Sequence, residues 1–322
     1  MNIVVIGLGS MGKRRIRLIK EMYPEYHVMG VDGREDRRKE AADLFDMQTF
    51  ESMGAVDSDV DCAFISTSPL SHASIISECL QRGWHVFTEL NLVDTGYDDN
   101  MKLAHDKGVT LFLSSTFFYR EEIRYIRSKI TDDKKWNYVY HIGQYLPDWH
   151  PWENYKDFFV GDKRTNGCRE IMAIELPWLT GTFGNVSDAK VVSDKMTDLN
   201  IGFDDNYMMV LEHENGNKGT LIVDVVSPVA VRKLEVYSEG AYLSWNGTPD
   251  SVSEFDPEAK KLNPVVLNEA VEHMEGYSSF VVENAYKNEI REFFDVVLNG
   301  KTPLYGFEQD KKILELIDRL GA

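Results

Sequence analysis

The sequence contains few cysteines and no long apolar run. Its three cysteines, at positions 62, 79 and 168, show no CxxC spacing, which argues against a disulfide framework and against a zinc site. Free thiols are typical of the reducing cytoplasm. No apolar stretch approaches the roughly 18 residues of a membrane span, and the start of the chain lacks the basic segment of a signal peptide. These absences predict a soluble cytoplasmic protein without a bound metal.

Basic side chains are also scarce. The chain of 322 residues has 35 lysines and arginines against 53 aspartates and glutamates, which gives a net charge of -18. Such a surface repels phosphate backbones and anionic lipid, so we expect neither nucleic acid nor a membrane as a partner. A local basic pocket for an anionic small molecule is still compatible with this charge. The length and the 43% share of hydrophobic residues predict two globular domains.

The first third of the chain alternates short apolar runs with amphipathic stretches. Short, continuous runs rich in Val, Ile and Phe are typical of strands buried on both faces of a parallel sheet, and their alternation with helices is typical of βαβ units. We therefore assign residues 1–118 to a Rossmann-type, doubly wound dinucleotide-binding domain. The predicted strands are Ile3–Ile6, His27–Val31, Cys62–Ser66, His85–Thr88 and Val109–Leu113, and the predicted helices are Met11–Met22, Glu35–Leu44, Ser71–Arg82 and Tyr97–Lys107.

The remainder of the chain, residues 119–322, has a different pattern. After a predicted helix at Arg120–Ile130, strands follow one another closely without helices between them, which indicates an α+β domain built on an open antiparallel sheet. An open sheet has one face to cover, so we expect a homo-oligomer. The predicted strands are Val139–Tyr145, Lys190–Ser193, Asn206–Glu212, Gly219–Val226, Leu234–Ser238 and Ala241–Trp245, and the last predicted helices are Tyr286–Leu298 and Phe307–Leu320.

A glycine-rich motif follows the first predicted strand at the start of a helix. Residues 7–12 read GLGSMG, a match to GxGxxG, in which the glycines allow a tight turn, close approach of a pyrophosphate and close helix packing. Asp32 stands at the end of the second strand, where a carboxylate would accept hydrogen bonds from ribose hydroxyls. This combination predicts a nicotinamide dinucleotide as cofactor. The predicted binding residues of this part are Gly7, Gly9, Ser10, Met11, Gly12, Asp32, Gly33 and Arg34.

The choice between the two dinucleotides depends on the charges after the second strand. Asp32 would repel a 2′-phosphate, which favours NAD. Arg34, Arg37 and Arg38 follow directly, and guanidinium groups suit phosphate, although Arg37 and Arg38 also fit the solvent-exposed face of the next helix. We predict NAD and keep NADP as the alternative.

Several segments together resemble the glucose–fructose oxidoreductase, inositol dehydrogenase and rhizopine-catabolism family, Gfo/Idh/MocA. They are the opening GLGSMGKRR, ISTSP at residues 65–69 with His72, GWHVFTE at residues 83–89, and GQYLPDW at residues 143–149. The resemblance implies that Thr67, Ser68 and His72 lie near the pyrophosphate or the nicotinamide, and that Glu89 lies near the nicotinamide ribose. For His72, a role in capping or packing the next helix is an equal alternative. Beyond residue 185 the resemblance rests on the layout of the elements alone.

The chain departs from the family at its catalytic positions. Family dehydrogenases carry Glu-Lys-Pro with a catalytic lysine, whereas residues 89–91 here read ELN and place Leu90 at the lysine position. The family's second motif supplies an aspartate and a histidine, but both positions fall on apolar residues in either register of residues 167–178. A positioned proton-transfer group contributes typically about 10²–10⁴-fold to the rate. The usual mechanism is therefore lost unless other groups replace these three.

Three residues are candidates for this replacement. Glu175 lies within the substituted motif, but an ion pair with Arg169 or a buried structural role explains it as well. Tyr119 has the chemistry to donate a proton to a carbonyl, or is a core aromatic residue with a satisfied hydroxyl. His150 has the right ordinary pKa, and its aromatic neighbours form either a packed loop or a surface on which a sugar stacks. Arg169 and Glu170 either bind substrate or pair with each other.

Two classes of function follow. The first is an NAD(P)-dependent oxidoreductase of the Gfo/Idh/MocA type, acting on a sugar, a sugar nucleotide or a polyol with a non-standard acid/base set. The second is a cofactor-binding protein without hydride transfer, such as a sensor, a scaffold or a partner subunit. A lyase or isomerase that uses bound NAD transiently is a third option.

Overall fold

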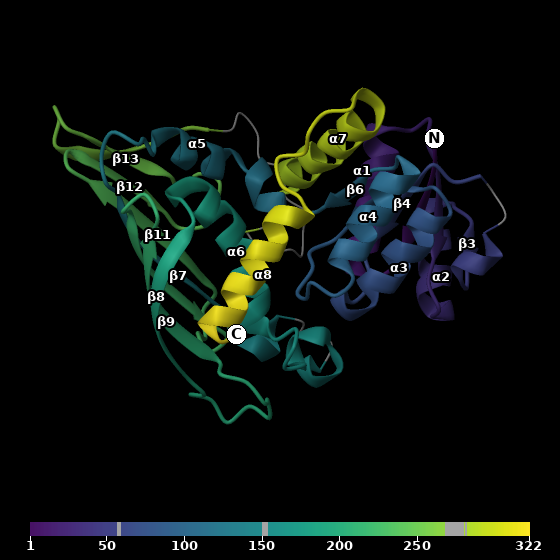
Figure 1. Ribbon diagram of the computed structural model, residues 1–322, viewed down its shortest axis with the longest axis horizontal. Coiled ribbons are helices and arrows are strands. Elements are labelled where there is room, and N and C mark those ends of the chain that lie inside the picture. Colours follow the sequence, from purple (N-terminus) through teal and green to yellow (C-terminus); the bar gives the residue numbers. More distant parts are fainter. Residues whose placement is uncertain (57–58, 150–153, 268–279, 281) are drawn as a thin grey trace. The chain divides into compact units, whose positions relative to one another are not determined.

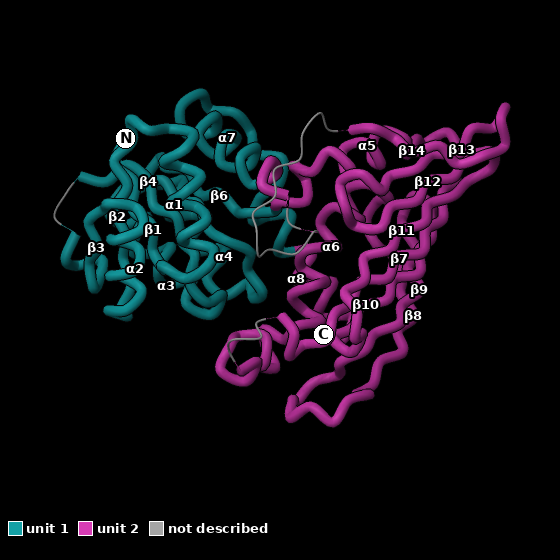
Figure 2. The backbone as a smooth tube through the Cα atoms, turned by 180° about the vertical axis from the view of Figure 1, so that it is seen from behind, with its two compact units in different colours: residues 1–115, 286–311 teal, residues 116–285, 312–322 magenta. Residues whose placement is uncertain are grey.

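The computed structural model describes residues 1–56, 59–149, 154–267, 280 and 282–322 (Figure 1). The chain forms two compact units, residues 1–115 with 286–311 and residues 116–285 with 312–322 (Figure 2). The sequence interpretation placed one boundary after residue 118, whereas here the chain also returns to the first unit at residues 286–311. No helix among the described residues is long and apolar enough to cross a membrane.

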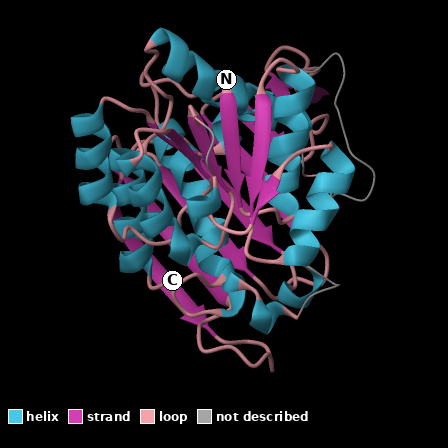
Figure 3. Ribbon diagram, turned by 90° about the vertical axis from the view of Figure 1, so that its right-hand side faces the viewer, coloured by secondary structure: helices cyan, strands magenta, loops and turns pink. Residues whose placement is uncertain are grey.

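The first unit is built on a six-stranded parallel sheet with the strand order β3-β2-β1-β4-β5-β6. Its strands alternate with helices along the chain. Figure 3 shows the strands in magenta and the helices in cyan. The strands are β1 (Asn2–Ile6), β2 (His27–Val31), β3 (Thr49–Phe50), β4 (Cys62–Ile65), β5 (His85–Thr88) and β6 (Leu111–Leu113). The helices are α1 (Ser10–Met22), α2 (Glu35–Phe45), α3 (Pro69–Gln81), α4 (Tyr97–Lys107) and α7 (Glu283–Asn299).

The core of this unit forms because its strands are apolar on both faces. β1 and β4 are almost fully buried, as the continuous apolar runs predict. On one face, Phe293 of α7 packs edge-on against Phe64, Phe87 and Phe112 of three neighbouring strands, with ring centroids 5.1 to 5.7 Å apart. A helix that comes late in the chain therefore completes the core of the first unit.

The second unit is built on an eight-stranded sheet with the strand order β14-β13-β12-β11-β7-β10-β9-β8. Neighbouring strands are antiparallel except for β7 and β10, which pair in parallel at the centre of the sheet. The fold class predicted from the sequence is confirmed, with this parallel pair as a correction to a purely antiparallel sheet. The strands are β7 (Asn137–Gly143), β8 (Val186–Asp194), β9 (Asn206–His213), β10 (Lys218–Asp224), β11 (Val231–Ser238), β12 (Ala241–Trp245), β13 (Ser253–Asp256) and β14 (Lys261–Pro264).

The helices of this unit lie on one side of its sheet. α5 (Glu121–Lys129) and α6 (Gly167–Phe183) share that side in Figure 1, and α8 (Phe307–Leu320) ends in the same unit. The alternation of buried and exposed residues along β9 fits one covered and one open face, since Tyr207 and Met209 are buried while Met208 and Val210 are 50% and 48% exposed. The described 3-10 helices of this unit are Thr116–Tyr119, Leu146–Asp148, Tyr155–Asp157 and Phe159–Gly161, and Met53–Ala55 is a 3-10 helix of the first unit.

Candidate functional site

The glycine-rich segment forms a tight turn between β1 and α1. Gly7 has a φ of +92°, a conformation that other residues rarely adopt, and its N–H donates to the Val31 carbonyl at 2.8 Å. A Cβ on Gly12 would lie 1.9 Å from the Gly7 carbonyl oxygen, so the helix begins in direct contact with the turn. Both glycines are therefore required by local packing.

The start of α1 presents amide groups to solvent. The first N–H groups of a helix have no intrahelical acceptor, and α1 begins at Ser10 with Gly9 as its N-cap and no side-chain cap. Ser10 is exposed, and Gly9 and Met11 are partly exposed. A Cβ on Gly9 would meet nothing nearer than Arg37 Nη1, at 3.6 Å. This helix end is open to an anion, which its dipole favours.

The Asp32 carboxylate lies at the end of β2, beside the glycine turn. Its Oδ2 accepts a hydrogen bond from the Leu8 N–H and its Oδ1 from the Arg34 N–H, both at 2.8 Å. Each oxygen keeps a lone pair for a further donor. A Cβ on Gly33 would meet nothing within 4 Å, so the space beside the carboxylate is open. Asp32 is therefore held where it can accept from a pair of ribose hydroxyls.

Three arginines follow Asp32, and two of them are committed to protein groups. Arg34 bonds the Asp36 carboxylate through Nε at 3.1 Å and Nη2 at 2.5 Å. Arg38 Nη1 donates to the carbonyl oxygens of Asp32, at 2.7 Å, and Gly33, at 3.0 Å. Arg37 makes a longer ion pair, 3.8 Å from Nη1 to Asp32 Oδ2, and its side chain is 36% exposed.

The loop after β4 lies against the glycine turn. A Cβ on Gly7 would come within 2.6 Å of the Ser66 carbonyl oxygen and 2.9 Å of Thr67 Cγ2. Thr67 Oγ1 forms a hydrogen bond of 2.9 Å with Ser71 Oγ, and Ser68 is the N-cap residue of α3. β1 and β4 are neighbours at the point where the strand order reverses, and doubly wound sheets bind ligands in the crevice outside that point.

His72 is a buried anchor for this loop. Its Nε2 donates to the Thr67 carbonyl at 3.0 Å, and its Nδ1 lies 2.6 Å from Asn91 Oδ1. Burial lowers the pKa of His72. Asn91 is itself buried, and Leu90 is partly exposed and apolar. The position of the family lysine thus carries no proton-transfer group, and the next residue holds His72.

Glu89 belongs to a buried ionic cluster. Arg15 of α1 is fully buried and donates to Glu89 Oε1 at 2.6 Å, to Glu89 Oε2 at 3.1 Å and to Glu289 Oε2 at 2.8 Å. Glu289 Oε1 accepts from Ser114 Oγ at 3.0 Å and from the Ser115 N–H at 2.7 Å. This cluster (Arg15, Glu89, Glu289 and Ser114) fixes the Glu89 carboxylate, which remains 14% exposed, at the carboxyl end of β5.

In the second unit, Glu175 is fully engaged by hydrogen-bond donors. Its Oε2 accepts from Tyr140 OH and Trp178 Nε1, both at 2.7 Å, and its Oε1 accepts from Arg232 Nε at 3.1 Å and Nη2 at 2.7 Å. Glu175 is completely buried. These four hydrogen bonds occupy the oxygens that a base would use. The partner is Arg232, whereas Arg169 pairs with Asp318.

The other two sequence candidates are Tyr119 and His150. Tyr119 lies buried in the 3-10 helix Thr116–Tyr119. His150 lies outside the described residues.

The structure adds one group that sequence reasoning left unresolved. Glu170 stands in the first turn of α6, and its Oε2 is shielded from solvent with no hydrogen-bond partner among the described residues. Burial raises the pKa of Glu170 to about 7. Its neighbour Arg169 bonds Asp318 Oδ1 and the Ala322 carbonyl, both at 2.7 Å. Glu170 is therefore a carboxyl group that can exchange a proton near neutral pH.

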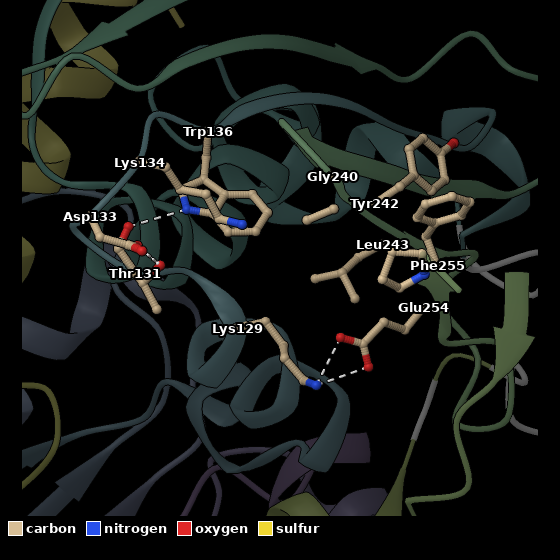
Figure 4. Close-up of a pocket in the computed structure, with 12 residues that line it drawn as sticks. Lys129, Thr131, Asp133, Lys134, Trp136, Gly240, Tyr242, Leu243, Glu254 and Phe255 are labelled. Atoms are coloured by element: carbon tan, nitrogen blue, oxygen red, sulfur yellow. Dashed lines mark hydrogen bonds and ion pairs between the residues drawn. The ribbon is translucent and has the colours of Figure 1, made fainter. Parts of the chain in front are cut away.

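A cavity of about 330 Å³ lies elsewhere in the second unit (Figure 4). Its walls carry Lys129, paired with Glu254 at 2.8 Å, and Lys134, which lies 4.7 Å from the ring centre of Trp136. It contains none of the predicted site residues. Among the described residues, no group of His, Cys, Asp and Glu side chains is arranged to hold a metal ion.

Comparisons with known proteins agree with this geometry. Residues 1–113 match the model of an oxidoreductase family with an NAD-binding Rossmann fold, GFO_IDH_MocA. No curated protein matches the chain.

The whole chain is similar in fold to several solved structures. UDP-N-acetylglucosamine 3-dehydrogenase GnnA from Acidithiobacillus ferrooxidans has 14% identity and a TM-score of 0.77, with 99% of this chain and 96% of that chain covered. The WlbA dehydrogenase from Chromobacterium violaceum, in complex with NADH and UDP-GlcNAcA, has 13% identity and a TM-score of 0.77, with 99% and 92% covered. Levoglucosan dehydrogenase, in complex with NADH and levoglucosan, has 14% identity and a TM-score of 0.81, with 99% and 96% covered.

Other similar structures hold NAD or NADP+. Identities this low show a shared fold, and the family model carries the assignment of the cofactor class. The prediction of a nicotinamide dinucleotide is thereby confirmed, as is the resemblance on which part of it rested. Residues 1–113 therefore match the Gfo/Idh/MocA oxidoreductase family and its NAD-binding Rossmann fold.

Proposed function

We propose that the protein is an NAD-dependent oxidoreductase that acts on a sugar, a sugar nucleotide or a polyol with a non-standard acid/base set. The observation that carries the proposal is the pairing of an open helix start at Ser10 with a fixed carboxylate at Asp32. A dinucleotide needs a donor surface for its pyrophosphate and an acceptor for its adenosine ribose, and these two features supply both.

Different residues of the first unit bind different parts of the cofactor. The amide groups of Gly9, Ser10 and Met11 hold the pyrophosphate, and Asp32 holds the adenosine ribose hydroxyls. Thr67, Ser68 and Glu89 bind toward the nicotinamide end, and His72 positions their loop through its bond to the Thr67 carbonyl. The bound nicotinamide supplies the hydride acceptor or donor, and the protein holds it in register with the substrate.

NAD is favoured over NADP for an electrostatic reason. A 2′-phosphate placed at the ribose would face the Asp32 carboxylate, while Arg34 and Arg38 are already bonded to protein groups. The remaining arginine, Arg37, reduces this repulsion without removing it, because its Nη1 stands 3.8 Å from Asp32 Oδ2. We therefore expect the site to bind NADP more weakly than NAD.

The substrate class rests on the similar structures, two of which are named for sugar nucleotides and one for levoglucosan. A small carbohydrate also agrees with the charge of -18, which disfavours polyanions such as nucleic acid as partners. The three buried free thiols support the reducing cytoplasm as the location of the protein.

A homo-oligomer is also part of the proposal. Val192 and Met208 are neighbours across β8 and β9 on the open face of the large sheet, and they are 72% and 50% exposed. Exposed apolar side chains on adjacent strands of one face favour burial against a second copy.

The first test is a titration of the purified protein with NADH and with NADPH, in which binding is measured by fluorescence. We expect saturable binding, and we expect at least one member of a panel of sugars, sugar nucleotides and polyols to reduce NAD. Failure to bind either dinucleotide at millimolar concentration would sink the proposal.

The alternative, a cofactor-binding protein without hydride transfer, is favoured by Leu90 at the position of the family lysine. It predicts NADH binding with no turnover on the entire panel. A Leu90→Lys variant should then remain inactive as well, because the family aspartate and histidine are also absent. A large gain of activity in that variant would argue against this alternative.

A further inference from the structure

Asn91 stands where the family carries a proline, whose side chain has no hydrogen-bonding group. It is buried, and its Oδ1 lies 2.6 Å from His72 Nδ1. The other ring nitrogen of His72 donates to the Thr67 carbonyl at 3.0 Å. Thr67 in turn lies against the glycine turn, since a Cβ on Gly7 would come within 2.9 Å of Thr67 Cγ2. Asn91 therefore reaches the loop that we propose for the nicotinamide end of the cofactor through a single side chain.

The ring of His72 is surrounded by oxygen acceptors. A ring nitrogen donates only when it carries a hydrogen, so Asn91 Oδ1 favours a hydrogen on Nδ1. Thr88 Oγ1, which lies 3.3 Å from the same nitrogen, donates to the Glu89 carbonyl at 3.2 Å and presents a lone pair to the ring. Burial lowers the pKa of His72, and the hydrogen bonds to Asn91 and Thr67 oppose that shift. The charge of Glu89 acts in the same direction as these bonds.

The other end of the Asn91 amide faces the Tyr97 hydroxyl. Asn91 Nδ2 is shielded from solvent and completes no hydrogen bond within the described residues. Burial and the Asp310 carboxylate raise the pKa of Tyr97, whereas the Asn91 amide acts to lower it, as a donor beside the phenolic oxygen does. The Tyr97 hydroxyl gives its one hydrogen to Asp310 Oδ2 at 2.5 Å, so it can only accept on the Asn91 side. This arrangement keeps Nδ2 toward Tyr97 and Oδ1 toward His72.

Asp310 fixes the direction of the Tyr97 hydroxyl. The carboxyl group is fully buried in the first turn of α8, and its Oδ1 accepts from Tyr305 OH at 2.8 Å. Burial raises the pKa of Asp310 to about 6, and the two tyrosine hydroxyls act to lower it. At pH 8 the carboxyl is therefore ionised and accepts from both hydroxyls.

We propose that Asn91 is a positioning residue of the cofactor site, and that the Tyr97–Asp310 pair sets the direction of its amide. The line of contacts runs from Asp310 through Tyr97, Asn91 and His72 to the Thr67 carbonyl. Its four side chains are buried and belong to the first unit. A reversed amide would place a donor where His72 now meets an acceptor, and the ring would then hold the loop less firmly. The inference rests on the cofactor role proposed for this loop.

The first experiment measures the pKa of His72 without cofactor. Nitrogen-15 spectra of histidine-labelled protein, assigned with His72→Gln, are recorded between about pH 4 and pH 8, on either side of the ordinary histidine pKa of about 6.5. Tyr97→Phe should lower the pKa of His72, because the Asn91 amide is then free to turn. Tyr305→Phe removes a hydroxyl from the same carboxylate and should leave that pKa unchanged. A pKa that is unchanged or raised in Tyr97→Phe, or equally lowered in Tyr305→Phe, would overturn the proposal.

The second experiment measures NADH affinity by fluorescence. Asn91→Leu should weaken binding by about 2- to 10-fold, the equivalent of one hydrogen bond. Asn91→Asp should retain more of the affinity and raise the pKa of His72, because its carboxylate still accepts from the ring. The matched control is Asn100→Leu, the same change at a buried asparagine that donates to the Ala73 carbonyl at 3.0 Å, and it should leave the affinity unchanged.

Two outcomes separate this inference from the function on which it rests. If Asn91→Leu binds NADH as the wild type does, or loses no more affinity than Asn100→Leu, the positioning role is refuted while the proposed function stands. If the wild type binds neither dinucleotide, the proposed function fails and the positioning role fails with it. The His72 titration then still shows whether the Tyr97–Asp310 pair orients the Asn91 amide.

Discussion

Replacing Arg15 by methionine tests whether the buried ionic cluster holds the first unit together. Arg15 and Glu289 are both fully buried, and the guanidinium is shared between Glu289 and Glu89. Methionine keeps much of the length of the side chain and removes the charge. Breaking a buried pair by removing one partner typically costs about 3–5 kcal/mol, because the other charge is left uncompensated. We expect a loss of this order in the free energy of unfolding.

The loss should depend on pH with a definite sign. Burial already raises the pKa of Glu289, and Arg15 opposes that rise, so the pKa climbs further when Arg15 is removed. A carboxyl whose pKa is higher in the folded state than in the unfolded state binds more protons when folded. Stability is therefore greatest at acidic pH and falls as the pH rises toward the folded pKa. Arg15→Met should be more destabilising at pH 8 than at pH 5.

The assay is urea unfolding of the wild type and the variants at both pH values. The control, Arg17→Met, makes the same chemical change on the same helix. The Arg17 side chain is 29% exposed, and its ion pair with Glu21 is long, at 3.8 Å. The control should therefore lower the free energy of unfolding by at most about 1 kcal/mol. Adding Glu289→Gln to Arg15→Met should recover part of the loss, because the uncompensated charge is gone. If Arg15→Met costs no more than Arg17→Met, or costs the same at both pH values, the reasoning is refuted.

Three shorter predictions concern the cofactor site and the open sheet. Asp32→Asn should weaken NADH binding by roughly 10- to 100-fold, because a hydrogen bond to a charged group contributes about 1.5–3 kcal/mol. The same variant should reduce the difference between the NADH and NADPH affinities in fluorescence titrations. Gly12→Ala should abolish binding and destabilise the fold, since its Cβ would stand 1.9 Å from the Gly7 oxygen, whereas Gly54→Ala, with its nearest atom 3.8 Å away, should be tolerated in the same titration and in thermal unfolding. Val210→Asp on the open sheet face should shift the proposed oligomer toward monomer in light scattering, and an unchanged mass would argue against that interface.

The elements of the first unit could be predicted because the information is local. Strands buried on both faces read as short apolar runs, and β2, β5 and α4 have the predicted bounds. β3 has two residues, too short for any periodicity to register. The parallel pairing of β7 with β10 joins strands that are far apart in the chain, so no adjacent turn indicates it.

The ionic cluster and the partner of Glu175 could not be predicted for a similar reason. Arg15 and Glu289 are 274 positions apart, and the sequence around each gives no sign of the other. Glu175 was weighed against Arg169, six positions away, whereas the fold pairs it with Arg232 on β11. The sequence singled out Glu170 beside Arg169 but could not give its raised pKa, because that comes from burial, and burial of one carboxyl depends on the whole surrounding structure.

In the proposed cofactor site, we expect Arg37 to determine how strictly the protein distinguishes NAD from NADP. Its guanidinium stands 3.8 Å from the Asp32 carboxylate and 3.6 Å from the place of a Cβ on Gly9, so it borders the positions proposed for the ribose and the pyrophosphate. A 2′-phosphate would gain a charge-assisted hydrogen bond from it. Arg37→Ala should therefore weaken NADPH binding more than NADH binding. Arg34→Ala, which removes a guanidinium bonded to Asp36, should leave the ratio of the two affinities unchanged. Equal losses for both dinucleotides in Arg37→Ala would mean that this arginine binds the shared pyrophosphate, and that the Asp32 carboxylate alone sets the preference.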